Sequence, residues 1–197
     1  MASRRCFTDS DTWNGGFYEI AIELGACSDV RLETALRRVW SFADLAGPYL
    51  ESSREPTEQQ ITERIPLEGH LYGLATVDGH GPVACGSVAI RSDAGDDWLH
   101  FYLPLGALGT VLPVGAFPFD DGSHESWRRP VDAWLANLGR HVYAAVEFPL
   151  GLVGFEPGTV EPIAAATIAK HGLPDRRCDG ILVSRSRALA WYPRNQP

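Results

Sequence analysis

The chain has 197 residues, of which 45% are hydrophobic and 21% charged, and its formal net charge is −8. This composition predicts one ordinary globular domain over residues 1–197 and excludes a disordered, fibrous or membrane-spanning protein. The acidic excess would repel a phosphate backbone, which argues against nucleic acid as a partner. No apolar run approaches the roughly 20 residues that cross a bilayer, so no membrane partner is expected either.

Cysteine and lysine usage gives an expectation about the cellular setting. The four cysteines, at positions 6, 27, 85 and 178, never approach a C-x-x-C spacing. We therefore expect reduced thiols and no bound metal, as in a cytoplasmic protein. Lys170 is the only lysine among 17 basic residues. Arginine has GC-rich codons and lysine AT-rich ones, so we interpret this bias as the mark of a GC-rich bacterial source.

The first half of the chain shows both strand and helix periodicity. Apolar residues alternate at period two from residue 17, and then recur at spacings of three and four until Gly47-Pro48, which is expected to end a helix. Clusters of Gly, Asp and Ser separate the later strands. In order, we predict an irregular segment over 1–14, a strand over 17–24, a helix over 29–46, an exposed loop over 51–66, and strands over 71–77, 83–91 and 98–103.

The second half repeats this mixture. We predict a helix over 126–142, a strand over 145–155, a helix over 160–171 capped by Thr159, and strands over 181–184 and 188–192. Short connections between successive strands favour antiparallel pairing. The chain is therefore predicted to be an α+β protein with a mainly antiparallel sheet, two long helices and one short helix. The same order would also accommodate a pseudo-duplication of two βαββ-type units.

The segment 104–123 has no clear periodicity although it is rich in apolar residues. Two interpretations are open. Long irregular segments in compact domains often act as lids or binding loops. Apolar loops also commonly cover apolar surface, and on that ground we favour an irregular part of the core.

The sequence carries none of the common catalytic or cofactor-binding motifs. The chain has no phosphate-binding glycine loop of either common type, no G-x-S-x-G elbow and no histidine pair at zinc-binding spacing. We therefore expect no cofactor.

Two strands carry the best candidates for a ligand site. Alternation places Trp98, His100 and Tyr102 on one face of their strand, and it places Glu19 and Glu23 together on one face of the first strand. If both faces turn to the same side of one sheet, carboxylates lie beside aromatic rings. Such a surface suits an organic cation. The alternative is that the glutamates are solvated and the rings lie beneath a helix.

A third cluster of titratable residues precedes the second long helix. It contains Asp121, His124 and Glu125, which are weak candidates for acid–base catalysis. Acidic residues are also favoured at helix N-termini by the helix dipole, and we prefer that interpretation.

These observations leave three hypotheses about function. The first is a non-catalytic domain that binds a small organic molecule, most simply a cation, between the aromatic and acidic residues. The second is an acidic protein-interaction module, such as an immunity-type or antitoxin-type inhibitor, for which the −8 charge would steer a basic protein partner. The third is a hydrolase that uses the Asp121, His124 and Glu125 cluster. The sequence specifies neither the ligand nor the oligomeric state.

Overall fold

The computed structural model describes residues 5–93, 95–116, 118–119, 122–157, 163–186 and 188–196. Its strands form one sheet of eight in the order β2-β3-β4-β5-β1-β6-β7-β8, and every neighbouring pair is antiparallel. The predicted α+β class with an antiparallel sheet is confirmed. The strands are β1 (Phe17–Ala26), β2 (Leu45–Tyr49), β3 (His70–Val77), β4 (His80–Arg91), β5 (Asp96–Pro104), β6 (Leu150–Phe155), β7 (Gly180–Arg185) and β8 (Ala188–Tyr192).

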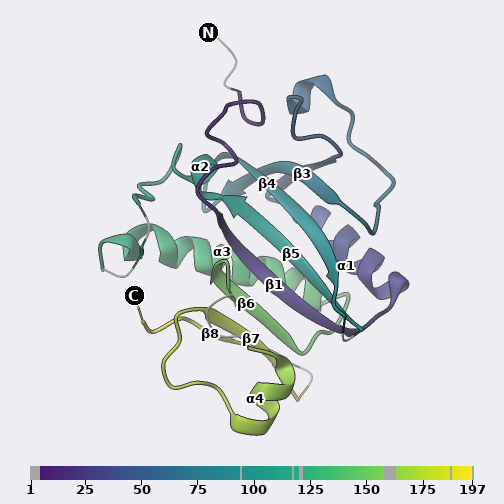
Figure 1. The fold of residues 1–197 in the computed structure, drawn as a ribbon, viewed down its shortest axis with the longest axis vertical. Helices are drawn as coiled ribbons and strands as arrows, with labels where there is room; N and C mark the ends of the chain where they lie inside the picture. The colour runs from purple at the N-terminus through teal and green to yellow at the C-terminus, as the bar shows by residue number, and fades with distance from the viewer. Residues whose placement is uncertain are drawn as a thin grey trace.

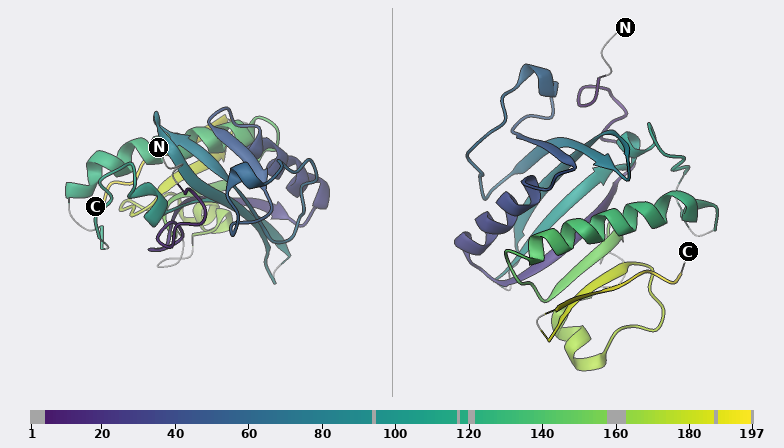
Figure 2. Two further views of the ribbon diagram at one scale, coloured as in Figure 1. Left: turned by 90° about the horizontal axis from the view of Figure 1, so that it is seen from above. Right: turned by 180° about the vertical axis from the view of Figure 1, so that it is seen from behind.

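Two long helices cover one face of this sheet, as Figures 1 and 2 show from opposite sides. They are α1 (Asp29–Trp40) and α3 (Glu125–Tyr143). The shorter helices are α2 (Leu105–Leu108) and α4 (Ala165–His171), and the 3-10 turns are η1 (Pro56–Glu58) and η2 (Gly122–His124). We call the sheet face beneath α1 and α3 the covered face.

The main core lies between the covered face and its two helices. Alternation along β1 sends Tyr18, Ile20 and Ile22 to this side, and each is at most 1% exposed. Both helices present apolar residues at spacings of three and four to these strands. The buried helix residues include Leu32, Leu36, Val39, Trp127, Val131, Leu135, Leu138 and Val142.

A smaller apolar cluster lies on the opposite side of the sheet, beneath α4. It joins Leu150 and Leu152 of β6 to Ile181 of β7 and Ile168 of α4. Its strand members alternate with residues of the main core, so β6 and β7 are buried on both faces. The partly buried Trp98 also packs against this cluster.

The structure corrects the predicted end of the first helix. α1 ends at Trp40, and Leu45–Tyr49 forms the edge strand β2 instead of the last helical turn. Val30, predicted on the buried stripe, is 76% exposed. The physical reason is strand pairing, because Leu45 and its neighbour pair with β3, which local periodicity does not reveal.

The second half needs smaller corrections. The strand predicted from residue 145 begins at Leu150, because Ala145 and Val146 donate backbone hydrogen bonds back to Val142 at the end of α3. The helix predicted from residue 160 begins at Ala165 in the described chain, and its predicted cap, Thr159, lies outside the described residues.

The described part of the segment 104–123 packs into the main core. Leu108 is fully buried, and Val114 and Phe119 are at most 6% exposed. The segment was predicted to be irregular, but its residues Leu105–Leu108 form the short helix α2, which buries Leu105, Ala107 and Leu108.

Cys27, Cys85 and Cys178 form no disulfide bond in the described part of the chain, and Cys85 is fully buried in the core. Among the described residues, no helix is both long and apolar enough to cross a membrane.

Candidate functional site

Part of the sheet lacks a helical cover on the side opposite α1 and α3. We call this side of β3, β4, β5 and β1 the open face. This face is turned to the viewer in Figure 1. Among the described residues, no helix crosses the middle of β4, β5 or β1 on this side. The segment that precedes β1 lies toward the top of the picture, and α4 lies toward the bottom. Ile90 of β4 lies on this face and is 48% exposed.

The strand register brings the five predicted binding residues onto the open face. Glu19 of β1 lies directly opposite Tyr102 of β5, and Glu23 lies opposite Trp98. His100 lies between these pairs, opposite Ala21. Opposite residues of an antiparallel pair have Cβ atoms about 5 Å apart, so the carboxylates and rings are immediate neighbours.

Glu19 is the most deeply placed carboxylate of the open face. It is 8% exposed, and its Oε1 lies 3.2 Å from Nδ1 of His100. Among the described residues its second oxygen has no hydrogen-bond partner, and no described side-chain polar atom is both unpaired and fully buried. This second oxygen therefore reaches the solvent-accessible surface of the protein.

Tyr102 forms a wall of the site, not an accessible phenol. It is 4% exposed, its ring lies 4.7 Å from that of Phe17, and its hydroxyl is 2.7 Å from Nδ1 of His70. Burial raises the pKa of Tyr102 far above its usual value, so the hydroxyl stays protonated. Gly86 makes this placement feasible, because a Cβ there would run into the Tyr102 ring.

Trp98 and Glu23 mark the end of the open face nearest α4. Glu23 Oε2 accepts a hydrogen bond of 2.8 Å from the backbone N–H of Ala165. Burial raises the pKa of Glu23, and the charge of Asp96 adds to the rise, although the Ala165 hydrogen bond opposes it. The indole N–H of Trp98 has no partner in the described part of the chain and is solvent-accessible.

Two residues of this site were missed by the sequence analysis. His70 reaches Tyr102 across β4. Asp179 lies over Gly154, whose opposite neighbour in β1 is Glu19, because a Cβ on Gly154 would meet the Asp179 carboxylate. Neither could be found from local periodicity, since each depends on which strands are neighbours. Asp179 adds a third carboxylate to this side of the sheet.

A buried ionic network on the covered face was also missed. Asp132 of α3 accepts hydrogen bonds from the Tyr18 hydroxyl and from Nε of Arg194, the latter at 3.1 Å. Arg194 also bonds Glu125 at 2.7 Å, and Arg128 donates to the Tyr18 oxygen at 3.3 Å. Burial raises the pKa of Asp132, although Tyr18 and both arginines lower it. The network joins the C-terminal segment to α3, beside a cavity of about 380 Å³.

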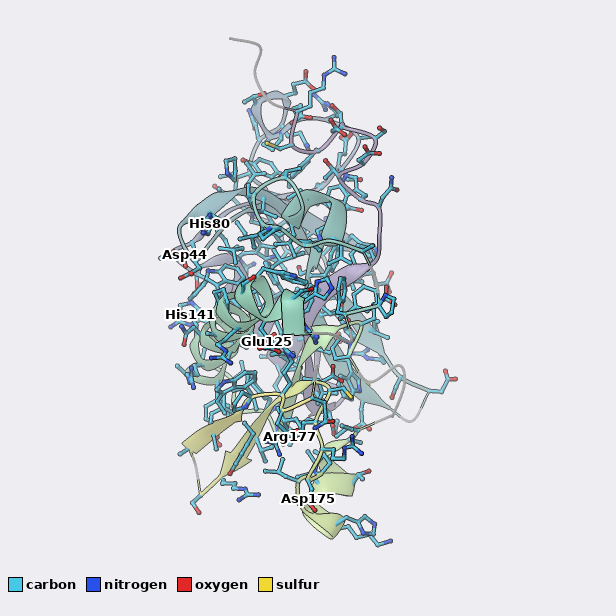
Figure 3. All side chains as sticks on the ribbon, turned by 90° about the vertical axis from the view of Figure 1, so that its left-hand side faces the viewer. Asp44, His80, Glu125, His141, Asp175 and Arg177 are labelled. Carbon is cyan, nitrogen blue, oxygen red and sulfur yellow. The ribbon has the colours of Figure 1, made fainter. Side chains whose placement is uncertain are left out.

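Of the predicted catalytic cluster, His124 and Glu125 lie among the described residues. Asp121 lies outside them. His124 Nδ1 contacts the Val114 carbonyl oxygen at 3.0 Å and the Trp127 indole at 3.3 Å. Glu125, labelled in Figure 3, is in the first turn of α3 and is paired with Arg194. These contacts agree with the helix-start interpretation.

Comparisons with protein-family models, curated proteins and solved structures yield no match for this chain. Function is therefore inferred from the geometry of the two faces of the sheet.

Proposed function

We propose that this chain is a non-catalytic, cytoplasmic protein of bacterial origin that binds a small organic cation on its open face. The observation that carries the proposal is the Glu19 carboxylate. It is almost buried beside aromatic rings, yet one of its oxygens is unpaired in the described chain and accessible. A carboxylate in such surroundings is stabilised by a bound cation.

The surroundings of Glu19 favour a cation over an anion. Glu23 and Asp179 add negative charge on the same side of the sheet, and Trp98 presents a partly exposed indole ring. Aromatic faces attract cations through their quadrupole, by about 0.5–2 kcal/mol for each contact. An anion would be repelled by Glu19 and Glu23, so charge selectivity is expected.

Tetraphenylphosphonium and tetraphenylborate provide a matched test, because they have nearly the same shape and opposite charges. We expect the cation to raise the Tm with concentration, as a ligand that prefers the folded state must. Calorimetry should show weaker binding, by about tenfold or more, for Glu19→Gln, which removes a charged partner. Glu33→Gln, on the exposed side of α1, is the matched control.

Equal binding of the two ions, or equal binding by the parent and Glu19→Gln, would overturn the proposal. Failure of both ions to bind would also overturn the proposal.

The second candidate function is an acidic protein-interaction module on the same face. It is supported by Ile90, whose exposed side chain lies directly opposite Trp98. Exposed apolar residues beside acidic ones suit a basic protein partner, which long-range charge would steer to this face. This candidate becomes the leading one if the phosphonium test fails.

A further inference from the structure

A cavity separate from the open-face residues Glu19, His100 and Tyr102 lies beneath α4. It has a volume of about 600 Å³, within the range typical of small-molecule sites. One wall is the side of α4 that carries Ala165, Ile168 and Ala169, and the floor includes Val183 of β7. These side chains are small or apolar, so most of the surface that a ligand would meet is hydrocarbon.

The rim of this α4 cavity carries one positive charge. Arg185, at the end of β7, lines the cavity and holds its guanidinium 5.4 Å from the centre of the Tyr192 ring. Within the described part of the chain, this guanidinium forms neither an ion pair nor a hydrogen bond. By contrast, Arg91 is paired with Asp97, and Arg194 is paired with Asp132.

An apolar cavity with an unpaired arginine at its rim is complementary to an amphipathic anion. A hydrocarbon chain would gain roughly 0.8 kcal/mol for each CH₂ group that it buries. The planar guanidinium binds a carboxylate through two parallel hydrogen bonds. Tyr192 holds the guanidinium beside the cavity in advance, which lowers the entropy lost when the anion binds.

We infer that the α4 cavity is a binding site for an aliphatic carboxylate, with the hydrocarbon chain between α4 and β7 and the carboxylate on Arg185. This site differs from the open face in its ligand. The open face carries carboxylates and selects a cation, whereas the α4 cavity carries an arginine and selects an anion.

Octanoate, octylammonium and octanol separate the contributions of charge and chain, because they share the hydrocarbon chain and differ in the head group. Calorimetry below the critical micelle concentration should show that octanoate binds more tightly than octanol. Octylammonium should bind more weakly than octanol. Arg185→Gln should reduce octanoate affinity by about tenfold and leave octanol unchanged. Arg37→Gln, on the solvent side of α1, is the matched control.

A second variant tests the cavity itself. Ala169→Leu places a larger side chain in the cavity while keeping good helix propensity, so it should weaken octanoate and octanol alike. Circular dichroism would show that both variants fold. Equal affinity of octanoate for the parent and Arg185→Gln would overturn the inference, and so would unchanged affinity in Ala169→Leu. Glu19→Gln should leave octanoate binding unchanged, so this test is independent of the phosphonium test.

Discussion

The two faces of the sheet are built from the same strands and differ in how their polar groups are satisfied. On the covered face, Trp40 donates its indole N–H to the buried Ser87 hydroxyl at 3.0 Å, and Asp132 is held by Tyr18 and Arg194. On the open face, Glu19 keeps one accessible oxygen without a partner in the described chain. Groups paired inside the protein stabilise it, whereas accessible unpaired groups remain available to a ligand.

β5 shows this difference within one strand. Leu99 and Phe101 point to the covered face and are at most 1% exposed, whereas Trp98 and His100 point to the open face and are only partly buried. Alternate residues of this strand therefore differ in burial: those on the covered face belong to the core, and those on the open face are the ones that the proposed function assigns to ligand binding. Substitutions on the two faces should affect different properties, and three predictions test this.

The largest expected effect is on the covered face, at Asp132. Asp132→Ala leaves Arg194 and the Tyr18 hydroxyl without their buried partner. Breaking a buried ion pair from one side typically costs about 3–5 kcal/mol, so the free energy of unfolding should fall by that amount in urea titrations. Glu33→Ala, at an exposed pair, should change it by less than about 0.5 kcal/mol. A loss at Asp132 as small as that at Glu33 would contradict the assigned role of the network.

The next prediction compares two isoleucines on opposite faces. Ile22 is 1% exposed and Ile90 is 48% exposed. Ile22→Ala should lower the free energy of unfolding by about 2–5 kcal/mol, because it leaves a cavity in the core. Ile90→Ala should change it by less than about 0.5 kcal/mol. Equal losses in urea unfolding would mean that the open face is as tightly packed as the covered one.

The smallest expected effects concern acid, which should act with opposite sign on two carboxylates. A hydrogen bond from Arg91 lowers the pKa of Asp97 at the edge of the covered face. Its stabilisation is present above the unfolded pKa of about 3.9 and is lost as the pH falls through the lower folded value. Burial raises the pKa of Glu23 on the open face. Its penalty, present at neutral pH, is removed as the pH falls through the raised folded value towards about 4.3.

Urea unfolding from pH 7 to pH 2 separates the two carboxylates. Asp97→Asn should be less stable than the parent at pH 7 and should converge with it in strong acid. Glu23→Gln should be slightly more stable than the parent at pH 7, with the difference fading near pH 4. A difference for Glu23→Gln that instead grows as the pH falls would show that the Glu23 carboxylate is stabilised in its charged form.

The sequence by itself determined the parts of this protein that depend on local periodicity. Alternation along residues 17–24 and 98–103 separated Glu19 from Ile20 and His100 from Phe101 correctly, because a pleated strand sends successive side chains to opposite faces. The spacing of apolar residues likewise identified the two long helices. Each pattern involves residues that are close together in the sequence, so it can be recognised without knowledge of the fold.

The tertiary structure alone decided which of these local faces meet. Glu19 lies opposite Tyr102 because β1 pairs with β5 in the antiparallel sense. The paired residues of these two strands are about eighty positions apart in the sequence. The Asp132 network similarly joins Tyr18, α3 and Arg194 across most of the chain. The edge strand β2 forms at a Gly-Pro sequence that locally reads as a helix end, because β3 supplies its hydrogen-bond partners. Pairing energies of this kind depend on distant residues, and no local pattern in the sequence records them.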